Sequence, residues 1–163
     1  MMGLYELFPV CDVLHSNHGS LALRRAKVEG IPMQYIRDNK EVLDAPDGWK
    51  WHFELVVNLP NGLKCMFVHQ LSANVLQAAK DKEMSLVEGH HHSKQVIHYW
   101  GAEKNPNFAV IPGCLIDNKS LAYAYNKTQS KSPRLGAMMI LNGDPIIIPM
   151  RLSKNGRWVG RKR

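Results

Sequence analysis

The stretch FELVVNLPNGLKCMFVHQ, residues 53–70, decides the fold class. Two runs rich in branched and aromatic residues, 53–59 and 64–68, flank the turn Pro60-Asn61-Gly62. Asn-Gly between two such runs favours a hairpin, because both residues tolerate the positive φ angles that tight hairpin turns require. The second run leads directly into His69. We therefore predict a β-hairpin whose second strand delivers a histidine to its end.

Further strands and helices are expected on both sides of this hairpin. Short apolar runs bounded by turn residues are typical of strands, and longer periodic runs that follow a capping residue are typical of helices. Ser20 and Ser72 are the expected caps. This mixture of elements indicates an α/β fold of the mixed α+β kind. The predicted strands lie at 10–14, 84–87, 95–100 and 108–111, a second hairpin at 136–150, and helices at 21–29, 32–43 and 73–82.

The composition is that of a folded chain. Its 163 residues, 45% of them hydrophobic, suit one domain with a packed core. The 3 cysteines are far apart, which predicts free thiols and a reducing compartment. No apolar run reaches the ~18 residues of a membrane span, and the first residues do not resemble a signal peptide. We expect a soluble, cytoplasmic protein without a membrane partner.

The whole chain has a net charge of +7, and its lysines and arginines are concentrated at the C-terminal end. Two interpretations are open for this tail, residues 151–163. Its cations can contact phosphate groups of a substrate or of nucleic acid, or they can form a solvated, frayed terminus. The cations that we select as candidate phosphate contacts are Arg157, Arg161, Lys162 and Arg163.

Histidines stand at the ends of several predicted strands. The chain has 8 histidines, and His18, His69, His90 and His92 follow apolar runs closely. Sites in α/β proteins are commonly built in loops at the carboxyl ends of strands, and imidazole is a common ligand for zinc, manganese, iron or nickel. Side chains alternate along a strand, so we expect His90 and His92, which leave the predicted strand 84–87, to project their rings to the same side. Together these residues predict a metal site.

The remaining single histidines have a simpler interpretation. His15, His52 and His98 each stand alone on a predicted strand or turn. A lone histidine in such a position is more often a hydrogen-bonded structural residue than a ligand. We therefore leave these three out of the predicted metal site.

Three segments resemble ordered blocks of the calcineurin-like metallophosphoesterases. Ser16-Asn17-His18-Gly19 resembles the family's G-N-H-[DE] block, His69 its next histidine block, and Gly89-His90-His91-His92 its G-H-x-H block. The segments Val110–Asn126 and Arg157-Trp158 are similar to phage-encoded members. The resemblance implies a partial calcineurin-like β-sandwich flanked by helices, and the cytoplasm of a phage-infected host as a location.

Roles for individual residues follow from the resemblance. It implies that Asn17, His69 and His90 ligate one divalent ion and that His92 ligates a second. His18 would stand near the scissile phosphate and either protonate the leaving oxygen or stabilise the transition state. Mn, Zn, Fe and Ni all suit this donor set. The implied activity is hydrolysis of a phosphomonoester or phosphodiester, with nucleotides and nucleic acid among the candidate substrates.

Two of the family's blocks, D-x-H and G-D-x-x-D, do not occur in the sequence. Residues 1–150 would then correspond to the C-terminal half of the family's domain, lacking its N-terminal strands, with 151–163 as the basic tail. Without those aspartates we expect one bound ion at most and an inactive isolated chain. An exposed sheet edge would be covered by a complementing N-terminal half, a second copy or an unrelated protein. The alternative is a catalytically inactive module that binds a protein or nucleic acid.

Overall fold

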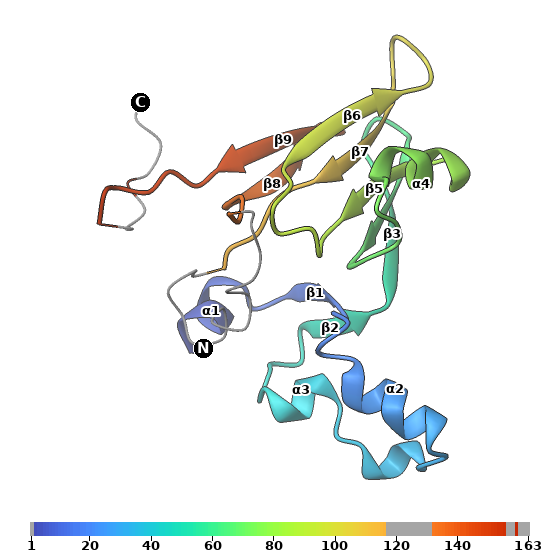
Figure 1. The fold of residues 1–163 in the computed structure, drawn as a ribbon, viewed down its shortest axis with the longest axis vertical. Helices are drawn as coiled ribbons and strands as arrows, with labels where there is room; N and C mark the ends of the chain where they lie inside the picture. Colours follow the sequence, from blue (N-terminus) through green and yellow to red (C-terminus); the bar gives the residue numbers. More distant parts are fainter. Residues whose placement is uncertain (1, 117–131, 156–158, 160–163) are drawn as a thin grey trace. The chain divides into compact units, whose positions relative to one another are not determined.

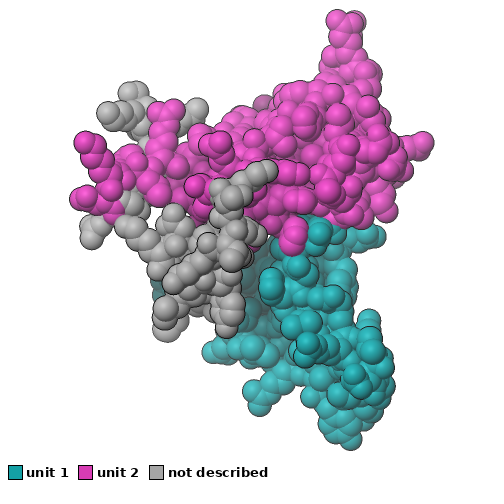
Figure 2. Space-filling model, in the orientation of Figure 1, with its two compact units in different colours: residues 1–55, 68–70 teal, residues 56–67, 71–163 magenta. Residues whose placement is uncertain are grey.

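The computed structural model describes residues 2–116, 132–155 and 159, and the chain divides into two compact units. Unit 1 comprises Met1–Leu55 and Val68–Gln70, and unit 2 comprises Val56–Phe67 and Leu71–Arg163. Figure 1 shows the elements along the chain, and Figure 2 colours the two units separately. The fold is mixed α and β, as the sequence predicts, and it contains a five-stranded mixed sheet and a few helices.

Unit 1 is built around a two-stranded parallel sheet. Its strands β1 and β2 pair in register from Cys11 opposite Trp49 to Leu14 opposite His52. The sequence analysis does not predict strand β2, which pairs with a strand 38 positions earlier in the chain. Tyr5 attaches α1 to this sheet through an edge-on contact with Trp49, with ring centroids 4.9 Å apart. The elements of unit 1 are α1 Met2–Leu7, β1 Cys11–Leu14, α2 Leu21–Val28, the 3-10 helix η1 Met33–Tyr35, α3 Asn39–Val42 and β2 Trp49–His52.

The predicted helix 32–43 is wrong as a single element. The chain makes only the short helix η1, and Ile36 then takes an extended conformation. Asp38 starts the separate helix α3 by accepting a hydrogen bond from the Glu41 backbone N–H at 2.8 Å. An aspartate in the middle of a helical pattern offers the backbone this capping bond instead of a continuous helix.

Little of unit 1 is buried. Ala26 and Val68 are its buried hydrophobic residues among those that the structure describes. Apolar side chains from every helix of the unit are instead exposed. These exposed residues are Leu4, Leu7, Phe8, Val10, Leu21, Val28, Ile31, Met33, Tyr35, Val42, Leu43 and Phe53.

The five-stranded sheet runs in the order β3-β4-β5-β7-β6 and lies mostly in unit 2. Strands β5 and β7 are parallel, whereas β6 and β7 are antiparallel, so the sheet is mixed. The predicted hairpins are confirmed at the turn around Gly62 and at Asn142-Gly143, where all three residues have positive φ. The elements are β3 Glu54–Asn58, β4 Lys64–Val68, α4 Val75–Asp81, β5 Ser85–Glu88, β6 Val96–Trp100, β7 Asn107–Ile111, β8 Gly136–Leu141 and β9 Asp144–Pro149.

A hydrophobic core fills unit 2. Cys65, Phe108 and Val110 are at most 1% exposed, and side chains of the β8–β9 hairpin pack against their cluster. Helix α4 packs on β5 and β7. Burial raises the pKa of the Cys65 thiol to about 12, so this cysteine is a neutral core residue. All three cysteines are free, as the sequence predicts.

Of the two predicted helix caps, Ser72 is wrong, and Ser20 is confirmed in position but forms no side-chain capping bond. Asn74, not Ser72, caps α4 by accepting a hydrogen bond from the Gln77 N–H at 3.1 Å. Ser20 occupies the N-cap position of α2, but its hydroxyl donates to the Ser16 carbonyl oxygen at 2.7 Å. Within the described part of the chain, no helix is long and apolar enough to cross a membrane.

Candidate functional site

A tight turn after β1 presents Asn17. The Gly19 N–H donates to the Ser16 hydroxyl at 2.8 Å, and the Ser20 N–H and hydroxyl both donate to the Ser16 carbonyl oxygen. Serine side chains that hydrogen-bond to nearby backbone groups hold such turns in one conformation. The turn therefore fixes Asn17 between the end of β1 and the start of α2.

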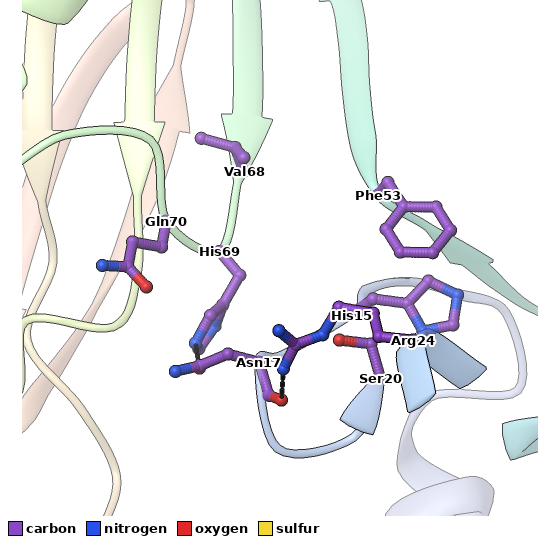
Figure 3. Close-up of a pocket in the computed structure, with 8 residues that line it drawn as sticks. All are labelled: His15, Asn17, Ser20, Arg24, Phe53, Val68, His69 and Gln70. Atoms are coloured by element: carbon purple, nitrogen blue, oxygen red, sulfur yellow. Dashed lines mark hydrogen bonds between the residues drawn. The ribbon is translucent and has the colours of Figure 1, made fainter. Parts of the chain in front are cut away.

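Asn17 contacts His69 within unit 1. The His69 Nε2–H donates to the Asn17 side-chain oxygen Oδ1 at 2.8 Å. The two residues come from different parts of the sequence, since His69 directly follows β4. The structure thus brings together two of the residues that the sequence selects, and Figure 3 shows them on one side of a pocket.

The pocket around this contact has an empty volume of about 530 Å³ that includes open solvent. Its lining contains no carboxylate, and its cation is Arg24. One Nη2–H of Arg24 donates to the backbone oxygen of Asn17 at 2.6 Å. The lining residues, all in unit 1, are His15, Asn17, Ser20, Arg24, Phe53, Val68, His69 and Gln70.

His15 also lines this pocket, although the sequence interpretation set it aside as structural. Its ring stacks on Phe53 with centroids 4.5 Å apart, and its Nδ1 accepts a hydrogen bond from Asn39 Nδ2 at 3.2 Å. Burial, and secondarily the neighbouring His52, lower the pKa of His15. A neutral ring that accepts at Nδ1 carries its proton on Nε2. The position of His15 directly after β1 was the feature that could have identified it.

His90 and His92 lie in unit 2, on the loop after β5. The ring centroid of His90 lies 6.4 Å from that of His92 and 5.4 Å from that of His91. The expectation that strand alternation aims His90 and His92 is wrong, because β5 ends at Glu88. His90 itself has a φ of 62°, so a left-handed turn, not a strand, sets the ring directions.

The buried carboxylate of Glu88 binds the loop 71–72, which in turn contacts His91. This carboxylate is fully buried, and Oε1 accepts hydrogen bonds from the backbone N–H groups of Leu71 at 2.8 Å and Ser72 at 3.0 Å. The Nε2 of His91 donates to the Ser72 carbonyl oxygen at 3.1 Å and lies 3.5 Å from Glu88 Oε1. His91 is therefore held by the loop 71–72, which the sequence did not indicate.

The other selected residues have different surroundings. His18 is exposed and does not line the pocket. The candidate tail cations Arg157, Arg161, Lys162 and Arg163 lie outside the described residues. His52 contacts Asp12, with Nε2 and Oδ1 2.7 Å apart. Within residues 2–116, 132–155 and 159, no group of three or more His, Cys, Asp or Glu side chains is placed to hold a metal ion.

A scan against protein-family models finds no match to this chain, and a search of curated proteins finds none. The metallophosphoesterase relationship therefore rests on the three sequence blocks and stays a prediction.

Proposed function

We propose that the chain is the C-terminal half of a calcineurin-like metallophosphoesterase domain that hydrolyses phosphomonoesters or phosphodiesters. The observation that carries this proposal is the contact between Asn17 and His69. These are the residues of two separate sequence blocks, 52 positions apart, and their side-chain atoms lie 2.8 Å apart. A chance resemblance of short motifs gives no reason for the two residues to meet.

The contact has the spacing of two ligands of one ion. Oxygen and nitrogen ligands about 2.0–2.2 Å from a metal are about 3 Å apart when they meet at a right angle. Asn17 Oδ1 and His69 Nε2 have nearly this separation, so the pair fits one edge of a coordination sphere. Binding would replace the proton that the two atoms share, so metal affinity should rise with pH. The roles implied for His90 and His92, which lie in unit 2, rest on the resemblance alone.

A bound divalent ion would polarise the phosphate and lower the pKa of bound water. The chain's own residues supply the surroundings of that chemistry. Asn17 and His69 fix the donor atoms, and the absence of carboxylates from the pocket lining favours an anionic substrate. His18 keeps its proposed role as the acid that protonates the leaving oxygen, and its exposure leaves it accessible to an entering substrate.

If the proposal is right, hydrolysis requires a second chain that supplies the two blocks absent from this sequence, D-x-H and G-D-x-x-D. The β1–β2 sheet supports this requirement, because a two-stranded sheet is marginally stable alone and parallel strands are normally covered on both faces. The exposed apolar side chains of unit 1 also support this requirement, because a second chain could cover them.

Metal content of the purified chain tests the proposal independently of turnover. After manganese or zinc loading and removal of free metal, elemental analysis should find up to one ion per chain. His69→Ala should abolish this binding, whereas His98→Ala should not, because His98 is an exposed residue of β6. Near-zero metal in the unmodified chain would sink the proposal.

A second candidate function is a binding module without catalysis. The exposed apolar side chains of unit 1 favour it, because a partner that covered them would remove apolar surface from water. Hydrolysis of an aryl phosphodiester by the metal-loaded chain, lost in His69→Ala and kept in His98→Ala, would exclude this candidate.

A further inference from the structure

We propose that Arg24 binds the phosphate group of the substrate in the pocket of unit 1. This inference rests on the proposed function, and it assigns phosphate recognition to α2 instead of the C-terminal tail. Arg24 lies in the first turns of α2 and lines the same pocket as Asn17 and His69 (Figure 3).

The guanidinium of Arg24 is held in place at one nitrogen and available at the others. Its Nη2 donates to the Asn17 backbone oxygen at 2.6 Å, which orients the side chain along the pocket wall. A guanidinium carries five N–H donors in a planar fork that matches the oxygens of a phosphate. Among the described residues Arg24 forms no ion pair with a carboxylate. Its charge is therefore not neutralised within the described chain.

The other residues that line the pocket are uncharged donors or apolar groups, so the pocket favours binding of an anion over binding of a cation. No lining residue is acidic, and His15 presents its Nε2–H because its Nδ1 accepts from Asn39. A fixed cation beside neutral donors in a concave site concentrates the field that attracts a negatively charged group. A phosphate group offers more oxygen acceptors to such a set of donors than a carboxylate does, and the planar guanidinium of Arg24 can donate to two of them at once.

Arg25 provides a matched control for this assignment. It is the next residue of the same helix, has the same charge and is exposed, but it does not line this pocket. Replacing either arginine by glutamine changes the net charge equally. A difference between the two variants therefore reports the position of Arg24, not the overall charge of the protein.

The test is a titration of the full chain with inorganic phosphate in the presence of a chelator. Binding is followed by the NMR shifts of the backbone amides of Ser20, Arg24 and Gln70. We expect phosphate to shift these signals in the unmodified chain, in Arg25→Gln and in a chain without residues 151–163. Arg24→Gln should weaken binding about tenfold or more, and Arg24→Lys, which keeps the charge without the fork, should weaken it less.

Three results would overturn the inference. The first is phosphate affinity in Arg24→Gln equal to that of Arg25→Gln. The second is loss of binding only on removal of the tail. The third is an equal loss in Arg24→Lys and Arg24→Gln, which would mean that the side chain acts structurally. Because the titration excludes metal, its outcome is independent of the metal analysis, so failure of this inference is distinguishable from failure of the proposed function.

Discussion

Units 1 and 2 differ in how they hold their histidines. Unit 2 has a core of buried side chains, and His91 in the loop of His90–His92 lies 3.5 Å from the buried carboxylate of Glu88. Unit 1 buries Ala26 and Val68 and leaves apolar residues of all its helices exposed. Its pocket is organised by hydrogen bonds of Ser16, Asn17 and Arg24 instead.

This difference suggests how firmly each unit holds its own candidate residues. A segment with few buried apolar contacts opens locally at low free-energy cost, whereas a core strand opens only with global unfolding. The Asn17–His69 pair therefore belongs to the adaptable part of the molecule, and the His90–His92 loop to the rigid part. We infer that a ligand or covering chain would order unit 1 more than unit 2.

Truncating a core phenylalanine should give the largest effect. Phe108→Ala removes a side chain that is 1% exposed, which should destabilise unit 2 by about 3–5 kcal/mol. Phe53→Ala, at a residue that is 55% exposed in unit 1, should cost less than about 1 kcal/mol. Native-state hydrogen exchange of the β7 amides measures the first effect. Equal losses in the two variants would contradict the contrast between the units.

Removal of the buried carboxylate should have the next largest effect. Glu88→Ala leaves the Leu71 and Ser72 N–H groups without their acceptor, which should cost about 2–3 kcal/mol. The exposed Glu54 of β3 provides the control, because Glu54→Ala should be nearly neutral. Urea unfolding followed by circular dichroism gives both values. A Glu88→Ala chain as stable as Glu54→Ala would show that this carboxylate does not anchor the loop.

The two helix caps give the smallest pair of effects. Asn74→Ala removes the cap of α4 on the core of unit 2 and should cost about 1 kcal/mol. Asp38→Ala removes the cap of α3, a four-residue helix in unit 1, and should lower global stability less, because α3 can fray without unfolding the core. Thermal unfolding of both variants measures the difference. A greater loss for Asp38→Ala would reverse the ranking of the units.

The sequence predicts the sheet better than it predicts the site. Asn-Gly and the alternating runs specify both hairpins locally, so β3, β4, β8 and β9 were expected. Strand β2 was missed because its pairing with β1 joins residues 38 positions apart, and a local pattern does not contain that partner. The helix break at Asp38 was missed because a capping hydrogen bond competes with helical periodicity.

The candidate site shows the same limit. Motif order identified Asn17 and His69, whereas Arg24, His15 and Glu88 act through contacts that only the folded chain displays. Alternation could not orient His90 and His92, because a positive φ at His90 ends the strand geometry. The sequence therefore predicts which residue types belong to the candidate site. It does not predict the backbone angles and the long-range contacts that orient their side chains.

Zinc titration of the full chain, followed by the ¹⁵N resonances of its imidazole rings, tests the central claim most directly. If Asn17 and His69 hold a metal, zinc should shift the His69 Nε2 resonance and remove its proton, while the exposed His98 stays unchanged. Asn17→Ala should weaken that response. Shifts confined to His90–His92, or no shift at His69 at saturating zinc, would contradict the claim.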